Sequence, residues 1–207
     1  MDDIRIAFNV LHPDTAAAFA HAFRDAPNVI VDRKDICQST ADCVVTAGNS
    51  FGYMDGGVDG AVNSMLSAFD ADERIDAAVR RQIAARYFGE QPVGTCLLLE
   101  TKHPRVRWLA HAPTMRLPED VGGTLNAYAA FRAALTEILL HNKRPIDYTT
   151  QPSRIRSVLT TAFCTGAGSM SAEKSARQMR AAYDSMVAPS YGYDWKQVWS
   201  AHRSLTA

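Results

Sequence analysis

The sequence has little of what several classes of protein require. Its four cysteines include no Cys-x-x-Cys pair, so a zinc ribbon or thioredoxin-like motif is not expected, and their apolar settings fit buried thiols in a reducing compartment. The 22 basic residues balance 22 acidic ones, which gives no support to bulk electrostatic binding of nucleic acid. No apolar run approaches the roughly 20 residues of a membrane span, and the start of the chain has no basic-then-apolar signal segment. We therefore expect a cytoplasmic protein without nucleic-acid or membrane partners.

Familiar catalytic and phosphate-binding motifs are also missing. A Gly-x-x-x-x-Gly-Lys-[Ser/Thr] motif does not occur, which argues against a P-loop NTPase, and neither His-Glu-x-x-His nor Gly-x-Ser-x-Gly is present. The stretch Gly166-Ala167-Gly168 begins like a dinucleotide fingerprint but lacks the final glycine, and it lies at the wrong end of the chain. We expect neither a metal nor a cofactor.

The 207 residues, of which 47% are hydrophobic, suit one domain with a full core. Strand-like and helix-like segments alternate along most of the chain, which predicts a sheet between two layers of helices. We expect a three-layer α/β/α sandwich with a mixed central sheet of about six strands, formed by a single monomeric domain over residues 1–207. The expected strands lie at residues 4–8, 29–31, 43–46, 95–99, 106–110 and 156–163.

Helix signals separate these strands. Pro13 is a plausible first helical position, and Ser171 is a good N-cap for a late helix that ends at Val187. The aromatic residues of the tail are expected to cover the core; they are Tyr191, Tyr193, Trp195 and Trp199. The expected helices lie at residues 13–27, 61–69, 72–87, 125–140 and 172–187.

Two glycine-bearing loops, residues 47–60 and 164–171, each follow a predicted strand and lead into a predicted helix. Ligands of open α/β sheets bind beyond the carboxyl ends of the strands. Glycines let the backbone approach a ligand closely, and helix N-termini offer free amide groups to phosphate oxygens. The two loops together could hold a diphosphate from both sides.

Three short segments carry a likeness to one family. Asp35-Ile36 precedes the predicted central strand, and Asn49 ends it. The stretch Gly56-Gly57-Val58-Asp59-Gly60-Ala61-Val62 follows, and Thr165-Gly166-Ala167-Gly168-Ser169-Met170 forms the late loop. In this order the segments resemble the macrodomains, a family that binds ADP-ribose and carries a Gly-Gly-Val-Asp-x-Ala-Ile loop. The resemblance covers roughly residues 30–183 and implies a macrodomain-like fold.

The resemblance implies a role for each segment. Asp35, with the Ile36 backbone beside it, would accept a hydrogen bond from the adenine amino group, and Asn49 would bond the distal ribose. The hydrolytic members use an aspartate ten residues after the asparagine to position or activate a water, and Asn49 and Asp59 have this spacing. The diphosphate and distal ribose would be lined by Gly56, Gly57 and Val58 on one side and by Thr165, Gly166, Ala167, Gly168, Ser169 and Met170 on the other.

Three positions depart from the family pattern. Ala47-Gly48 stands where the family commonly has two alanines, and Asp55 replaces the first of three loop glycines. Gly168-Ser169-Met170 lacks the aromatic residue that packs on the distal ribose in the family, and Phe51 or Tyr53 could take its place.

Two functions fit these residues. The first is binding of ADP-ribose or an ADP-ribosyl derivative with hydrolysis of an ADP-ribosyl bond, either on a modified protein or through deacetylation of O-acetyl-ADP-ribose. The second is a non-catalytic module that binds ADP-ribose or a signalling nucleotide, which Asp55 and the missing aromatic residue favour.

Purely structural roles remain open for single residues. Asn49 and Asp35 could serve turns, and Asp59 could cap a helix. His111 is expected to be structural rather than an acid–base group, and Cys164 is expected to be a small core residue.

Overall fold

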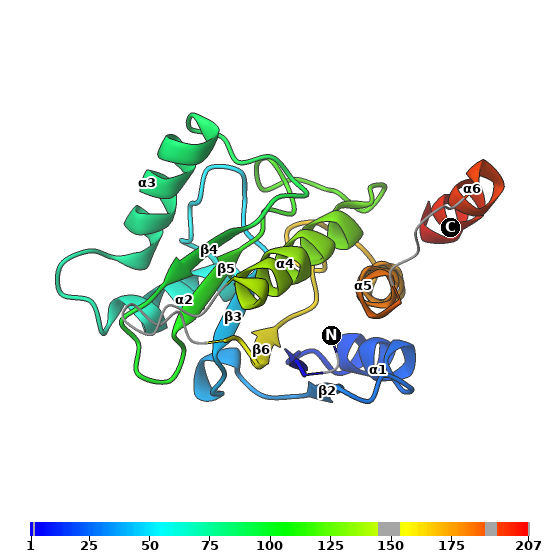
Figure 1. Cartoon of the computed structure of the whole chain (residues 1–207), viewed down its shortest axis with the longest axis horizontal. Helices are drawn as coiled ribbons and strands as arrows, with labels where there is room; N and C mark the ends of the chain where they lie inside the picture. Colours follow the sequence, from blue (N-terminus) through cyan, green and yellow to red (C-terminus); the bar gives the residue numbers. More distant parts are fainter. Residues whose placement is uncertain (2, 145–153, 189–193, 207) are drawn as a thin grey trace.

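The computed structural model describes residues 1, 3–144, 154–188 and 194–206. Within these ranges the expected alternation of strands and helices is present (Figure 1). The strands are β1 (Arg5–Asn9), β2 (Val29–Asp32), β3 (Cys43–Thr46), β4 (Leu97–Glu100), β5 (Trp108–His111) and β6 (Ser157–Thr160). The helices are α1 (Pro13–Ala22), the 3-10 turn η1 (Ile36–Gln38), α2 (Gly57–Ser67), α3 (Ile75–Tyr87), α4 (Asn126–Lys143), α5 (Ala172–Val187) and α6 (Trp195–Thr206).

The six strands form one mixed sheet in the order β2-β1-β6-β3-β5-β4. The strands pair in parallel except for β4, which runs antiparallel to β5 at the edge of the sheet. Every residue of the central strand β3 is buried, as expected for a strand covered on both faces. Because β3 and β6 are parallel neighbours, the loops that follow them meet at the same edge of the sheet.

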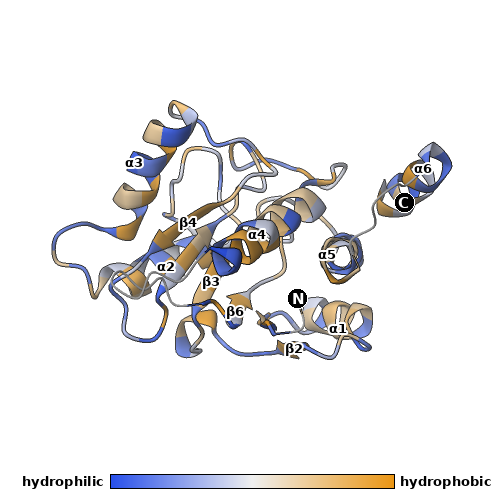
Figure 2. Cartoon of the chain, viewed as in Figure 1, coloured by the Kyte–Doolittle hydropathy of each residue, from blue (hydrophilic) through white to orange (hydrophobic). Residues whose placement is uncertain are grey.

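Two apolar cores cover the two faces of the sheet and confirm the three-layer α/β/α sandwich. On one face, inward residues of the strands pack with α1, α4 and α5, and Phe8 contacts Phe19 and Phe131 there. On the other face, Val44, Leu109 and their neighbours pack with α2 and α3. Figure 2 shows apolar colour on the strands between these helix layers.

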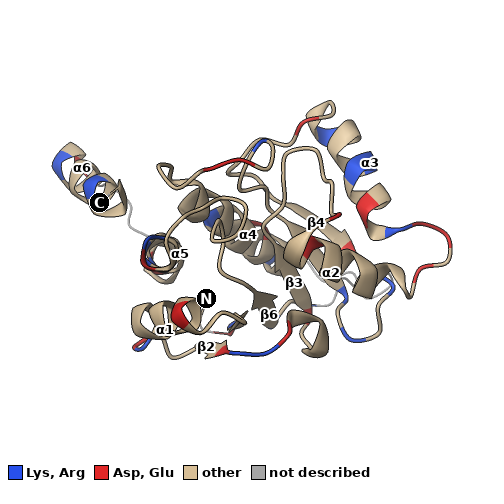
Figure 3. Ribbon diagram, turned by 180° about the vertical axis from the view of Figure 1, so that it is seen from behind, with Lys and Arg blue, Asp and Glu red and all other residues tan. Residues whose placement is uncertain are grey.

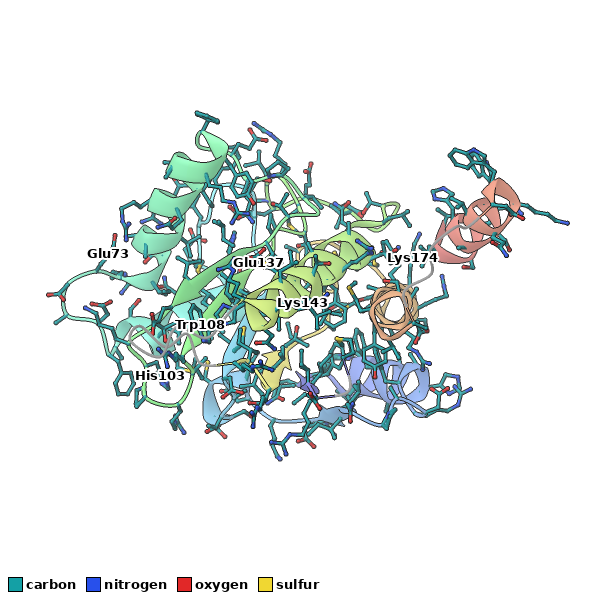
Figure 4. All side chains as sticks on the ribbon, viewed as in Figure 1. Glu73, His103, Trp108, Glu137, Lys143 and Lys174 are labelled. Carbon is teal, nitrogen blue, oxygen red and sulfur yellow. The ribbon has the colours of Figure 1, made fainter. Side chains whose placement is uncertain are left out.

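The end of α4 is fixed by a ring contact with the sheet. Trp108 of β5 packs edge-on against His141, with ring centroids 4.5 Å apart. Figure 4 labels Trp108 on β5 and Lys143, the last residue of α4. The helix ends at Lys143, three residues beyond the end expected at Leu140, and His141 is among the added residues.

The start of α2 also differs from the expectation. The helix begins at Gly57. The sequence placed its start at Ala61, because the glycines up to Gly60 suggested that the turn continued to that point. Ser171 is the N-cap of α5 as expected, and its hydroxyl accepts a hydrogen bond from the Lys174 amide at 3.2 Å.

The expectation that the tail aromatics cover the core is wrong for the two that the structure describes. Trp195 is 75% exposed and Trp199 is 54% exposed. Helix α6 reaches α5 mainly at its far end, where Leu205 is buried and its carbonyl accepts a hydrogen bond from Gln178, so its tryptophans lie away from the core. Tyr191 and Tyr193 lie outside the described residues. Among the described helices, none is both long and apolar enough to cross a membrane.

Candidate functional site

The two glycine-bearing loops meet around a cavity of about 420 Å³ at the carboxyl ends of β3 and β6. The segment after β5 closes a third side, because β5 is the other neighbour of β3 in the sheet. The lining residues are Ala47, Gly48, Asn49, Tyr53, Asp55, Gly56, Gly57, Val58, Asp59, Thr114, Met115, Pro118, Thr161, Ala162, Cys164, Gly166, Ala167 and Gly168.

The first loop presents the N-terminus of α2 to this cavity. Gly56 is the N-cap residue and makes no side-chain cap, while the first helical hydrogen bond runs from the Gly60 amide to the Gly56 carbonyl at 2.9 Å. The amides of Gly57, Val58 and Asp59 precede that bond and therefore have no partner within the helix. Free amides at a helix N-terminus, with the positive end of the helix dipole, form a site suited to an anion.

The backbone conformation at position 57 favours glycine. Its φ is +54°, in the left-handed region that other residues adopt at a cost. A Cβ built at Gly56 or Gly57 would meet no heavy atom within 4 Å, so these glycines leave space in the cavity rather than relieve a clash.

In the second loop, the two glycines have different roles. A Cβ at Gly166 would meet nothing within 4 Å, so this position opens onto the cavity. A Cβ at Gly168 would lie 2.7 Å from the Cys164 carbonyl oxygen and 2.8 Å from Val121, so this glycine permits close packing of the loop. Ala167 lies between them in the cavity wall.

The other predicted residues of this loop shape it from behind. The Thr165 hydroxyl donates to the Ala162 carbonyl, and Ser169 adopts a left-handed φ of +53°. Met170 is 3% exposed and packs in the core. These three side chains are not among the residues that line the cavity.

Asp35 and Ile36 lie apart from the cavity lining. Asp35 caps η1, because its carboxylate accepts a hydrogen bond from the Cys37 amide at 2.9 Å. Ile36 is buried in the core on the α2 side of the sheet. Their adenine-binding role stays a prediction from the resemblance.

Asn49 lines the cavity and also serves a turn. Its Nδ2 donates to the Tyr53 carbonyl at 2.7 Å, and its Oδ1 accepts from the Phe51 amide at 3.1 Å and from the Tyr53 amide at 3.3 Å. These bonds fix the side chain and the loop against each other. One Nδ2 hydrogen is left for a further acceptor.

Asp59 is the third residue of α2, so it is not the N-cap that its place before Gly60 allowed. It is half-buried, and no described residue forms a hydrogen bond or ion pair with its carboxylate. Removal of water around the carboxylate, together with the negative charge of Asp55, raises the pKa of Asp59 to about 7. A carboxyl group that titrates near neutral pH in a cavity is suited to proton transfer.

Gly48 and His111 explain one departure from the family pattern. A Cβ at Gly48 would lie 2.2 Å from His111 Nε2, so the imidazole occupies the space that an alanine methyl group would need. His111, the last residue of β5, is buried. Its Nδ1 lies 2.9 Å from Gln91 Oε1, and Gln91 Nε2 donates to the His111 carbonyl at 3.3 Å. Burial lowers the pKa of His111 to about 4, so the ring is neutral at pH 7, and its structural role stays a prediction.

Cys164 lines the cavity, and its thiol is largely buried. Burial raises the pKa of Cys164 to about 12, so the thiolate that nucleophilic chemistry requires is not formed at neutral pH. Met115 and Pro118 also line the cavity, although the sequence analysis did not single them out. They follow β5, a neighbour of β3, so the end of that predicted strand was the signal that could have identified them.

The charge of the cavity is negative. Asp55 and Asp59 line it, and no lysine or arginine is among its lining residues. Figure 3 shows the acidic band on α2, which contains no basic residue. Among the described residues, no group of three His, Cys, Asp or Glu side chains could hold a metal ion. The lining therefore offers a phosphate uncharged donors, chiefly backbone amides, and no cationic side chain.

Comparison with known proteins supports the likeness seen in the sequence. A family model described as Macro domain matches residues 45–179. Among curated proteins, none matches the chain by sequence.

Solved structures share the fold. The macrodomain of Mycobacterium tuberculosis DarG is 16% identical with a TM-score of 0.57, covering 74% of this chain and 88% of that one. A mutant Oceanobacillus iheyensis macrodomain with ADPR is 14% identical with a TM-score of 0.56, covering 83% and 88%. The Trypanosoma brucei macrodomain in complex with ADP is 18% identical with a TM-score of 0.52, covering 74% and 55%. From the family match and the fold together, the chain belongs to the macro domain family.

Proposed function

We propose that this chain binds ADP-ribose or an ADP-ribosyl derivative in the cavity between the two loops. The observation that carries the proposal is the pair of facing elements: the free amides at the start of α2 and the open position at Gly166. A diphosphate between them would accept hydrogen bonds from backbone amides without a basic side chain. The relatives solved with ADPR and with ADP are consistent with this ligand class.

We further propose that the chain hydrolyses an ADP-ribosyl bond. Asp59, with its pKa near 7, would accept a proton from a water as that water attacks the anomeric carbon of the distal ribose. The bond from that carbon to the substituent breaks, the substituent takes up the proton, and the products are free ADP-ribose and the protonated leaving group. A modified protein would be the substrate; deacetylation of O-acetyl-ADP-ribose, in which the water attacks the acetyl ester, is the small-molecule form of the proposal.

A non-catalytic binding module is the second candidate, and one observation favours it. The amide of Asn49 already forms hydrogen bonds with the loop backbone at both of its ends, which limits what it can offer to a water or ribose. On this alternative, Asn49 holds the loop in its binding conformation, and Asp59 contributes charge alone.

Replacement of Asp59 separates the two candidates. Asp59→Asn keeps the shape of the side chain but removes its capacity to accept a proton. The variant is expected to release no ADP-ribose from a modified protein, while its affinity for ADP-ribose, measured by calorimetry, stays largely intact. Asp14→Asn is the matched control, because Asp14 is also an acidic residue in the first turn of a helix, away from the cavity. Full turnover in the Asp59 variant would refute the catalytic role, and binding without any turnover in the wild type would favour the module.

A further inference from the structure

Asp55 lies between two cavities. It lines the main cavity, and with Tyr53 it also lines a second cavity of about 230 Å³. The second cavity is bordered further by Met54, Gly60, Asn63, Ser64, Arg74, Asp76 and Arg80. Tyr53 and Asp55 therefore lie where the linings of the two cavities meet.

The cations of the second cavity are bound to a different carboxylate. Arg80 Nη1 is 2.8 Å from one oxygen of Asp76, and Arg74 Nε is 3.2 Å from the other. Asp55 is exposed, and no described residue forms a hydrogen bond or ion pair with its carboxylate. A carboxylate left without a partner at a cavity boundary is available to a ligand.

The negative charge of Asp55 contributes to the raised pKa of Asp59, so the two carboxylates repel each other when both are ionised. A bound diphosphate would add further negative charge to the same cavity. A positive charge placed between the two carboxylates would offset both repulsions, and the lining of the main cavity supplies none.

Tyr53 adds a surface that suits a planar cation. Tyr53 is 57% exposed, and the guanidinium of Arg80 already lies over its ring, 5.4 Å from the centroid. A second planar cation could stack on the remaining exposed part of the ring. Carboxylates and an aromatic ring together are the groups that recognise guanidinium and pyridinium ions.

We propose that Asp55, with Asp59 and Tyr53, selects ligands that carry a planar organic cation on the distal ribose. The inference rests on the proposed function, because it requires the distal ribose to lie beside Asn49 and Asp59. The cation is either the guanidinium of an ADP-ribosylated arginine or the pyridinium ring of an oxidised nicotinamide dinucleotide.

The test uses pairs of ligands that differ in this charge. Calorimetry on the full chain compares NAD+ with NADH, whose nicotinamide ring is neutral, and a peptide ADP-ribosylated on arginine with the same peptide modified on serine. We expect at least one cationic ligand to bind roughly fivefold or more tightly than its neutral counterpart. The arm that shows the preference identifies the source of the cation.

Asp55→Asn is expected to abolish that preference and to bind ADP-ribose more tightly, because a negative charge beside the diphosphate is removed. Asp14→Asn makes the same change of charge away from the cavity and should keep the preference. Equal binding within both wild-type pairs, or an unchanged preference in Asp55→Asn, would overturn the inference while ADP-ribose binding stands. Failure of ADP-ribose itself to bind would instead refute the proposed function.

Discussion

Substitution of Gly48 by alanine tests the packing that sets the floor of the cavity. The new methyl group would lie 2.2 Å from His111 Nε2 and 2.8 Å from its Cδ2, well inside the roughly 3.5 Å at which such atoms pack. The imidazole cannot turn away freely, because Gln91 holds both its Nδ1 and the carbonyl of the same residue. Either the ring or the backbone at Gly48 must move.

The expected cost follows from these contacts. Overpacking of a buried position costs about 1–3 kcal/mol, and the loss of a hydrogen bond to Gln91 adds about 1 kcal/mol. We therefore expect Gly48→Ala to lower the free energy of unfolding by about 3 kcal/mol, which corresponds to a fall in melting temperature of roughly 6–12 °C for a domain of this size.

Urea unfolding of a double-mutant cycle provides the assay. Gly123→Ala is the control, because a Cβ at position 123 would meet no heavy atom within 4 Å. Removal of the ring in His111→Ala leaves room for the methyl group, so the two substitutions should couple by about 1–3 kcal/mol. The reasoning is wrong if Gly48→Ala is as stable as Gly123→Ala, or if its cost is the same with and without the His111 side chain.

Gly166→Ala should leave the unfolding free energy within about 0.5 kcal/mol of wild type, since its Cβ would contact nothing within 4 Å. The same substitution should weaken ADP-ribose binding roughly tenfold, because position 166 lines the cavity. Equal affinity of variant and wild type by calorimetry would contradict the cavity assignment. Gly168→Ala should instead lower the melting temperature by several degrees, because its Cβ would lie 2.7 Å from the Cys164 carbonyl oxygen, and an unchanged melting curve would disprove that close packing. Burial lowers the pKa of His111 from 6.5 to about 4, so the unfolded chain binds a proton at a higher pH than the folded chain does. The free energy of unfolding should therefore fall by up to about 3 kcal/mol as the pH is lowered from 6.5 toward 4. Urea unfolding of His111→Gln should show a smaller fall over the same range. The pKa of Asp59 is raised from 3.8 to about 7, so its contribution has the opposite sign, and the free energy of unfolding falls as the pH rises from 4 through 7. Asp59→Asn should therefore become more stable relative to wild type across this range. A difference in unfolding free energy that stays constant with pH would rule out the raised pKa.

The meeting of the two loops could be predicted from the sequence, because it depends on local signals and one general rule. Apolar runs marked β3 and β6, and glycines marked the loops that follow them. Parallel neighbouring strands bring their carboxyl ends to one edge, so Asn49 and Asp59 could be placed there before the fold was known.

Other features depend on contacts between distant segments and could not be predicted. The need for glycine at position 48 arises because β3 pairs with β5 so that Thr46 lies opposite His111. The different roles of Gly166 and Gly168 depend on whether the carbonyl of Cys164 is near, which the sequence does not reveal. The exposure of Trp195 and Trp199 follows from where α6 lies relative to α5 (Figure 1), and composition does not set this position.

Binding of ADP-ribose, compared with ADP, tests the central claim most directly. The cavity is proposed to hold a diphosphate on the amides of α2 and a distal ribose beside Asn49, so calorimetry on the wild-type chain should give tighter binding of ADP-ribose than of ADP. ADP-ribose at 100 times its dissociation constant should also stabilise the fold by about 2.7 kcal/mol in a thermal melt. Absence of any heat or melting shift at millimolar ADP-ribose, or equal affinity for ADP, would contradict the account.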